Sequence, residues 1–296
     1  MRAQVAKANL LLLLAALVWG ATFVAQRQAM EHMGPLFLSG LRFALGALAL
    51  LPLVVMSRRA GTGGLVRVNR VWTLAAGTIL AGCFMALGIN LQQVGLVYTT
   101  AGKAGFITGL YVVIVPFLSI VRGRFPGGGV LLGAFLAVSG LYLLSMSGSF
   151  TLARGDGWVL ACAFAWALQV QFLGWIAPRM DPFLLAFGQA AVCAAVSLAL
   201  AAVSEPVTLA GILASWKALA FGSIASVAVG FTCQVLGQRH SPPAHAALIM
   251  QLEAVFAGLS GWLVLHETMG VRGIVGCLLM LAGMLASQFL VRKQRP

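Results

Sequence analysis

A single carboxylate interrupts the apolar stretch LIMQLEAVFAG, which covers residues 248–258. A charged carboxylate in an apolar environment is costly, so Glu253 must face a cavity, meet a partner or be protonated. Two roles fit this position. Glu253 either hydrogen-bonds backbone groups freed by a bend and so holds a gating helix, or it binds an amine or exchanges a proton. His245 lies two helical turns earlier and joins Glu253 as a candidate gating or coupling residue.

Two tryptophans with polar neighbours form a second candidate group. Trp19, Thr22 and Gln26 are spaced i, i+3 and i+7, which places them on one face of a helix. Trp166 and Gln169 repeat the start of this pattern, and both tryptophans fall near the middle of apolar segments. Tryptophan in a membrane protein usually gathers at the two membrane interfaces. The pair therefore fits the wall of a central cavity, and packing between helices is the alternative.

Other polar side chains occur in apolar segments that could surround the same cavity. Arg42 lies about two turns into one of them. It could bind a carboxylate, extend toward the membrane surface, or bond the carbonyl groups of a helix end, and the sequence leaves these open. The predicted substrate-binding residues are Trp19, Thr22, Gln26, Arg42, Gln92, Lys103, Tyr111, Trp166, Gln169 and Gln234.

The patterns needed for catalysis are missing from the sequence. HETMG at 266–270 lacks the second histidine of a zinc-protease helix, in which two histidines at i and i+4 face one metal. Glu253 is the only carboxylate inside a predicted apolar segment away from its ends, and the chain's only aspartates are Asp156 and Asp181. The five cysteines show no metal-ligand spacing. We therefore expect no enzyme activity, no cofactor and no metal site.

Composition identifies the environment in which these residues must be positioned. Apolar residues make up 61% of the chain and charged residues 8%, whereas a soluble domain carries about 25% charged residues. A membrane-spanning helix needs about 20 mainly apolar residues. Ten segments qualify, and the sequence predicts an all-α polytopic membrane protein. They are 9–29, 35–56, 72–94, 100–121, 127–147, 155–177, 182–203, 214–237, 243–265 and 270–291.

The net charge of +13 is distributed in a way that predicts orientation and not nucleic-acid binding. Thirteen Lys and Arg residues fall in the termini and loops on one side and four on the other. The positive-inside rule then places both termini in the cytoplasm of a bacterial-type inner membrane. The side with more charge holds Arg2, Lys7, Arg58, Arg59, Arg67, Arg70, Arg122, Arg124, Arg179, Arg239, Arg292, Lys293 and Arg295; the other holds Arg27, Arg154, Lys217 and Arg272.

The chain also contains an internal repeat. An offset of 147 residues places Trp19 on Trp166 and Arg42 on Gln189, and an offset of 142 places Gln92 on Gln234. GAFLAVSG at 133–140 matches GCLLMLAG at 276–283 with an offset of 143. Each half, 1–147 and 148–296, thus contains five spans, and an odd number forces the second half to enter the membrane inverted. Inverted repeats are typical of secondary transporters, whose substrate site lies near the midplane between the repeats.

The fifth and tenth predicted spans carry almost no polar side chains. Their glycine pairs, Gly133 with Gly140 and Gly276 with Gly283, are spaced seven residues apart on one helix face, where small residues permit close helix contact. We expect these two helices to form a scaffold and not to line a substrate path.

Several short motifs make the chain resemble the EamA-type transporters of the drug/metabolite transporter superfamily. They are AGFITGLYVVIVP at 104–116, LEAV at 252–255 and LHE at 265–267, and the resemblance covers nearly the whole chain. It implies ten helices, a substrate cavity between the halves, and export of amino acids or other small metabolites in the bacterial branch. Two departures weaken any transfer of detailed mechanism. RGRF at 122–125 replaces the family's usual glutamate, and Ala254 stands where a proline often follows the ninth-helix glutamate.

We therefore expect a secondary exporter of small amphipathic metabolites that works by alternating access, with amino acids, including aromatic and hydrophobic ones, as the favoured substrates. A multidrug or lipophilic-cation exporter is the alternative, because Glu253 suits a cation whereas Arg42 and Lys103 suit a carboxylate. The expected partners are the lipid bilayer and the substrate, with a proton as the candidate coupling ion. The expected assembly is a monomer or a homodimer.

Overall fold

The computed structural model describes residues 2–60, 71–99, 101–145, 153–265 and 270–291. All regular secondary structure in these ranges is helical, and ten helical spans are long and apolar enough to cross a membrane. The predicted all-helical, ten-span architecture is confirmed. The elements are α1 (Arg2–Ala29), α2 (Pro35–Arg59), α3 (Val71–Tyr98), α4 (Ala101–Gly109), α5 (Tyr111–Val121), α6 (Gly128–Ser145), α7 (Arg154–Ile176), η2 (Ala177–Arg179), α8 (Pro182–Ser204), α9 (Leu209–Ala214), α10 (Trp216–Phe221), η3 (Gly222–Phe231), α11 (Thr232–Gln238), α12 (Pro243–Met250), α13 (Glu253–Leu265) and α14 (Val271–Val291).

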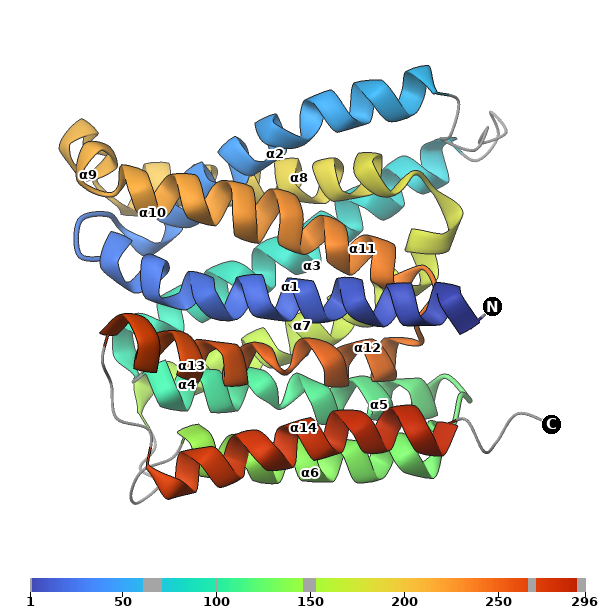
Figure 1. Ribbon diagram of the computed structural model, residues 1–296. Helices are drawn as coiled ribbons and strands as arrows, with labels where there is room; N and C mark the ends of the chain where they lie inside the picture. Colours follow the sequence, from blue (N-terminus) through green and yellow to red (C-terminus); the bar gives the residue numbers. More distant parts are fainter. Residues whose placement is uncertain (1, 61–70, 100, 146–152, 266–269, 292–296) are drawn as a thin grey trace.

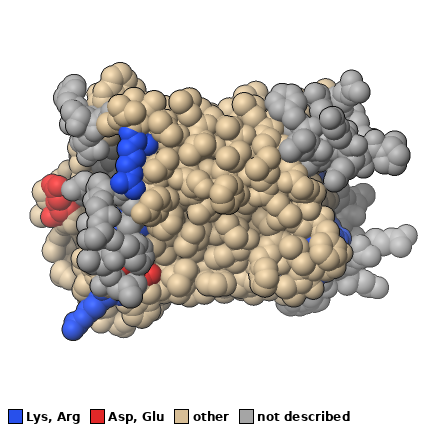
Figure 2. Space-filling model, turned by 90° about the horizontal axis from the view of Figure 1, so that it is seen from below, with Lys and Arg blue, Asp and Glu red and all other residues tan. Residues whose placement is uncertain are grey.

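The long helices run roughly side by side along one axis, with the loops gathered at the two ends (Figure 1). On the face shown in Figure 2, the coloured Lys, Arg, Asp and Glu side chains lie toward the ends, and an uncharged band separates them. Large apolar side chains such as Leu10, Leu48, Phe135 and Leu278 are exposed along the helices. This arrangement fits a protein whose middle band faces lipid.

Close glycine contacts show directly that the second half is inverted. A Cβ added to Gly133 would lie 2.6 Å from the carbonyl oxygen of Gly283, and one added to Gly140 would lie 2.4 Å from that of Gly276. Residue numbers thus rise along α6 while they fall along its neighbour α14. The two helices predicted as scaffold thus form an antiparallel pair whose backbones touch.

The two halves interleave instead of standing apart. Helix α1 packs against α11, η3 and α13 of the second half, and α7 packs correspondingly against α3, α4 and α5 of the first. Helices α2 and α8 pair with each other along their length. Each half therefore completes its own core with helices from the other half.

Side chains connect the ends of the α2–α8 pair. The Glu205 carboxylate, just after α8, accepts from the backbone N–H groups of Leu36 and Phe37 at 2.9 and 2.7 Å. It thereby caps the start of α2, where Gly34 offers no side chain to do so. At the opposite end, Asp181 caps α8 through the Leu184 N–H group at 2.9 Å and accepts from the Ser57 hydroxyl at 2.5 Å. These contacts hold α2 and α8 together at both ends.

Two segments predicted as single helices, 100–121 and 243–265, are interrupted near their middle. The Leu110 N–H donates to the Ile107 carbonyl at 3.2 Å, and the Leu252 N–H donates to the Ile249 carbonyl at 3.1 Å. Each bond spans three residues, which tightens the turn and separates α4 from α5 and α12 from α13. The sequence remains apolar through the first interruption, whereas the second lies at Gln251 and Glu253, where one of the two roles considered for Glu253 requires a bend.

The two interruptions lie against each other. A Cβ on Gly109 would lie 2.5 Å from Nε2 of Gln251, so a larger residue there would displace that amide. The Tyr111 hydroxyl also reaches the Ala247 carbonyl at 3.5 Å. Two broken spans from opposite halves therefore meet in the middle of the molecule.

Candidate functional site

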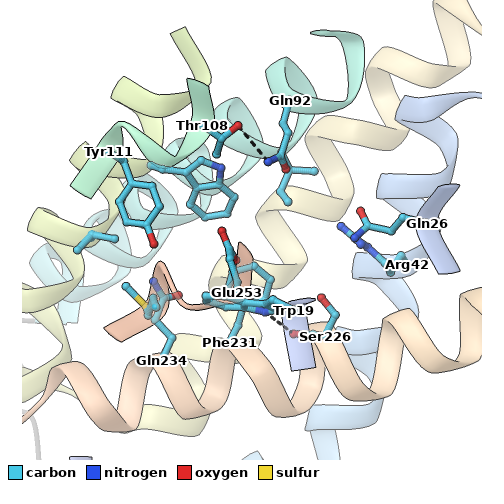
Figure 3. A pocket seen from close by; sticks show the side chains of 14 residues that line it. Trp19, Gln26, Arg42, Gln92, Thr108, Tyr111, Ser226, Phe231, Gln234 and Glu253 are labelled. Carbon is cyan, nitrogen blue, oxygen red and sulfur yellow. Dashed lines mark hydrogen bonds between the residues drawn. The ribbon is translucent and has the colours of Figure 1, made fainter. Parts of the chain in front are cut away.

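A cavity with about 600 Å³ of empty space lies where helices from both halves converge. Helices α6, α8 and α14 contribute no lining residue, which agrees with a scaffold role for the α6–α14 pair. The lining residues are Trp19, Gln26, Arg42, Ile89, Gln92, Thr108, Tyr111, Trp166, Val170, Ser226, Phe231, Gln234, Met250 and Glu253 (Figure 3).

Three aromatic rings form one wall of the cavity. The Phe231 ring lies between the two indoles, with its centroid 4.9 Å from that of Trp19 and 6.2 Å from that of Trp166. Each indole is accommodated by a glycine on the helix that it faces: a Cβ on Gly230 would lie 2.5 Å from Trp19, and one on Gly88 would lie 3.0 Å from Trp166. The wall can therefore receive an apolar or aromatic group, and its position requires the glycines opposite.

The backbone of the eighth span is also adapted to this wall. Residues 222–231 form a π-helical segment, η3, between α10 and α11. The Trp19 indole N–H donates to the Ser226 carbonyl within this segment at 3.2 Å. Short π-helical insertions are rare and occur frequently at functional sites.

Arg42 is the cationic side chain of the lining. It is only 2% exposed, so it does not extend to the membrane surface. Its Nε and Nη1 atoms are buried without a hydrogen-bond partner among the described residues. Gly222 leaves room for the side chain, because a Cβ there would lie 2.9 Å from the Arg42 Cδ atom. The guanidinium, 5.3 Å from the ring centre of Phe43, is placed at the cavity by packing and not by ion pairing.

The amides around the cavity have assigned directions. Gln26 uses its Oε1 atom to accept from Gln93 Nε2 at 3.0 Å, which leaves its own NH₂ group as the remaining polar group. Gln92 uses its Nε2 atom to donate to the Thr108 hydroxyl at 3.3 Å, which leaves its carbonyl oxygen. Figure 3 places Gln26 beside Arg42, whereas Gln92 and Glu253 lie elsewhere around the cavity. Donors therefore gather at the Arg42 end.

Glu253 is the first residue of α13, directly after the interruption of the ninth span, and it lines the cavity. Figure 3 shows its carboxylate directed into the space between the aromatic and amide side chains. No hydrogen bond joins the carboxylate to another group among the described residues, and the observed Lys103–Asp156 ion pair involves neither Glu253 nor Arg42. Glu253 is thus placed to meet a cavity occupant.

The lining reproduces the internal repeat in unusual detail. Five pairs of lining residues are related by the repeat offsets: Trp19 with Trp166, Ile89 with Phe231, Gln92 with Gln234, Thr108 with Met250 and Tyr111 with Glu253. Tyr111 and Glu253 each begin the helix that follows an interruption. The two charged lining residues break this symmetry, because Arg42 corresponds to Gln189, outside the lining, and Glu253 corresponds to a tyrosine.

The remaining predicted site residues lie outside the lining. Thr22 donates to its own helix at the Val18 carbonyl. Gln169 exchanges amide hydrogen bonds with Gln234, at 3.1 Å for the Gln234 donor. His245 contacts the Ser287 hydroxyl at 3.1 Å. Their roles in binding or gating stay predictions.

Lys103 forms an ion pair with Asp156, with Nζ 3.2 Å from Oδ2, and is absent from the cavity lining. Asp156 also accepts from the Thr99 hydroxyl at 2.6 Å and from the Ala153 N–H at 2.8 Å. Lys103 is thus engaged by a carboxylate outside the cavity, and substrate binding by Lys103 stays a prediction. The ion pair is a tertiary contact: the start of α7 reaches the α3–α4 connection and supplies the carboxylate.

Sequence reasoning missed six lining residues, which are Ile89, Thr108, Val170, Ser226, Phe231 and Met250. Most are apolar or weakly polar and give no chemical signal. The repeat would have found two of them, because Ile89 and Phe231 flank the predicted Gln92 and Gln234 by the same three residues in each half.

Comparison with known proteins adds three findings. Residues 6–146 and 153–287 both match the EamA-like transporter family. A transporter from Archaeoglobus fulgidus, described as uncharacterized, is 36% identical over 140 residues, which is 47% of this chain and 40% of that protein. A protein crystal structure superposes with a TM-score of 0.80 at 20% identity, over 98% of this chain and 99% of the other. The last similarity concerns the fold alone.

Proposed function

The chain belongs to the EamA-like transporter family and is a membrane transporter, not an enzyme; we propose that it exports small amphipathic metabolites from the cytoplasm, with amino acids, including aromatic and hydrophobic ones, as favoured substrates. The observation that carries this proposal is the composition of the central cavity. One guanidinium, one carboxylate and an aromatic wall line the same cavity. An amino acid offers a carboxylate, an ammonium group and, in the aromatic and aliphatic members, an apolar side chain.

The architecture supports alternating access as the mechanism. The cavity lies between interleaved halves, and the two interrupted spans meet beside it at Gly109 and Gln251. Interrupted helices at the interface of inverted repeats are typical of transporter binding sites. We propose that α4–α5 and α12–α13 change their bends while the α6–α14 pair stays fixed, so that the cavity opens to one side at a time.

Two roles for Glu253 remain in the proposal. As a coupling group, it exchanges a proton in each cycle or binds the substrate amine. As a structural group, it bonds backbone groups of the interrupted span in another conformation of the cycle. Its exposure to the cavity and the absence of a bond from a described residue to its carboxylate favour the first role in the conformation seen here.

Export of lipophilic cations is the second candidate function. The observation in its favour is that Glu253 lies beside indole rings, since a carboxylate and aromatic faces together attract organic cations. Arg42 opposes this function, because a buried guanidinium lining the same cavity repels a cation.

The orientation in a bacterial-type inner membrane, with cytoplasmic termini, is part of the proposal and follows from the loop charges. Exposed positions at the two ends test it. A cysteine at Glu31 should react with an impermeant thiol reagent in intact cells, and a cysteine at Arg124 should react only after lysis. The unmodified chain gives the background from native cysteines, and reaction of the Arg124 position in intact cells would reverse the orientation.

Substrate class is tested with vesicles containing the purified protein, loaded with radiolabelled amino acids or with a lipophilic cation such as tetraphenylphosphonium. The proposal predicts that aromatic and aliphatic amino acids leave faster than from protein-free vesicles. Faster efflux of the cation alone would establish the second candidate function instead. A monomer and a homodimer are both compatible with the proposal.

A further inference from the structure

The guanidinium of Arg42 lines the cavity although two of its nitrogen atoms are buried without a hydrogen-bond partner among the described residues. A buried guanidinium has lost most of its hydration, and an unpaired buried charge costs several kcal/mol. Two of its nitrogen atoms, Nε and Nη1, have no partner among the described residues. Nε belongs to the side edge of the guanidinium and Nη1 to its end edge, each edge being completed by Nη2, and either edge can bind a carboxylate through two hydrogen bonds.

Neighbouring groups complete an anion site around the guanidinium. The side chain packs at Gly222 and beside the Phe43 ring, which fixes the guanidinium in place. Gln93 donates a hydrogen bond to the side-chain carbonyl oxygen of Gln26. The NH₂ group of Gln26 therefore remains as a donor beside Arg42. Glu253 is the lining residue that carries a carboxylate, and this carboxylate forms no ion pair with Arg42.

We infer that Arg42, with Gln26 held by Gln93, forms an anion subsite that binds the carboxylate of the transported molecule and so orients it in the cavity. The inference rests on the proposed function and deepens it. A carboxylate fits better than a phosphate, because a dianion would meet one guanidinium and would be repelled by Glu253 in the same cavity. The subsite makes the chain selective for carboxylates over the corresponding decarboxylated amines.

Asymmetry between the halves supports this inference. The repeat places Gln189 where Arg42 stands, and Gln189 is buried in an amide cluster, 3.4 Å from Gln169 Nε2 and outside the lining. In the second half, the neutral amide of Gln189 is therefore enough to fill this position between the packed helices. The first half instead has a charged side chain that lines the cavity, so that the substrate is bound in one orientation on a frame that is otherwise symmetric.

The test measures binding to the purified full chain in detergent by isothermal titration. Three probes share a phenyl ring: L-phenylalanine, 3-phenylpropionate, which lacks the amine, and phenethylamine, which lacks the carboxylate. Arg42→Gln should weaken binding of both carboxylate probes about 10- to 100-fold, the usual effect of losing a charge-assisted hydrogen-bonded pair, and should leave phenethylamine binding unchanged. Arg42→Lys should retain part of the affinity, since it keeps the charge without the planar edge.

Two controls separate this role from a structural one. Arg272→Gln removes an exposed arginine outside the cavity and should bind all probes as the parent does. The melting temperature of ligand-free Arg42→Gln should equal or exceed that of the parent, because the substitution removes an unpaired buried charge. A structural arginine predicts a lower melting temperature for the Gln variant.

The outcomes also separate the subsite from the proposed function. Binding of 3-phenylpropionate that depends on Arg42, without export of any amino acid, would support the subsite and remove amino-acid export. Amino-acid export and binding that are unchanged in Arg42→Gln would support the function and overturn the subsite. Failure of both carboxylate probes to bind the parent chain would also overturn the subsite.

Discussion

The α6–α14 pair and the central cavity are both built from repeat-related residues, yet they differ in what the symmetry does. In the pair, glycine faces glycine across antiparallel helices, and the two contributions are equivalent. In the cavity, paired indoles and paired glutamines make a symmetric frame, but Arg42 and Glu253 each lack a charged counterpart. The comparison indicates that repeat-related residues pack the helices, whereas the residues that differ between the halves recognise the substrate. A substrate with two different ends needs two different binding groups.

The largest expected loss of stability comes from the scaffold. Gly140→Ala places a Cβ 2.4 Å from the backbone oxygen of Gly276, so the two helices must separate. Overpacking of this kind costs about 1–3 kcal/mol, and we expect a lower melting temperature of the purified protein. Gly128→Ala, on the same helix with open space around it, is the matched control. Equal melting temperatures for the two variants would contradict close packing of α6 and α14.

The aromatic wall should show the opposite pattern. We expect Trp19→Ala and Trp166→Ala each to reduce transport at least tenfold, the effect of about 1.4 kcal/mol, with protein level and melting temperature near those of the parent. If the indoles serve packing alone, truncation should cost about 3–5 kcal/mol and impair folding. Trp158→Ala, an exposed tryptophan on the same helix as Trp166, is the control for loss of an indole. A well-folded double mutant with normal transport would exclude the wall from the site.

Glu253 tests the charged, asymmetric part of the cavity. Glu253→Gln keeps the shape of the side chain but cannot ionise. We expect loss of concentrative export and of its dependence on external pH, while substrate exchange across the membrane survives, because exchange needs no net proton movement. Loss of exchange as well would assign Glu253 to amine binding. Tyr111→Phe, at the corresponding position in the first half, should retain the pH dependence. A pH profile of Glu253→Gln identical to the parent's would end the coupling hypothesis.

The smallest effect should come from the cap that joins α8 to α2. Glu205→Gln removes the charge that accepts from the Leu36 and Phe37 N–H groups and leaves one oxygen to accept. A lost cap interaction costs about 1 kcal/mol, so we expect a small decrease in melting temperature and unchanged transport specificity. Glu31→Gln, an exposed carboxylate at the same end of the molecule, should leave the melting temperature unchanged. Altered specificity in Glu205→Gln would show that the cap also positions Arg42 on α2.

The sequence by itself determined the architecture of this protein. A scarcity of charge over long apolar segments is a property of composition, so ten spans could be counted without coordinates. The repeat offsets predicted an inverted arrangement, and the Gly133/Gly140 and Gly276/Gly283 spacing predicted helix faces suited to close contact, which the structure shows to be in contact with each other. Seven of the ten predicted substrate-binding residues line the cavity, because polar side chains in an apolar helix are few and need an aqueous or polar surrounding.

Only the tertiary structure decided which of these polar residues are engaged elsewhere. Lys103 and Arg42 are both basic residues within apolar spans, but the start of α7 brings Asp156 to Lys103, while nothing comparable reaches Arg42. The interruption at Leu110 and the π-helical segment at 222–231 left no signal in the sequence, whereas the interruption at Leu252 lies between the polar residues Gln251 and Glu253. Hydropathy averages over a helix, whereas an ion pair or a shifted backbone hydrogen bond depends on which single atoms from distant segments come within bonding distance.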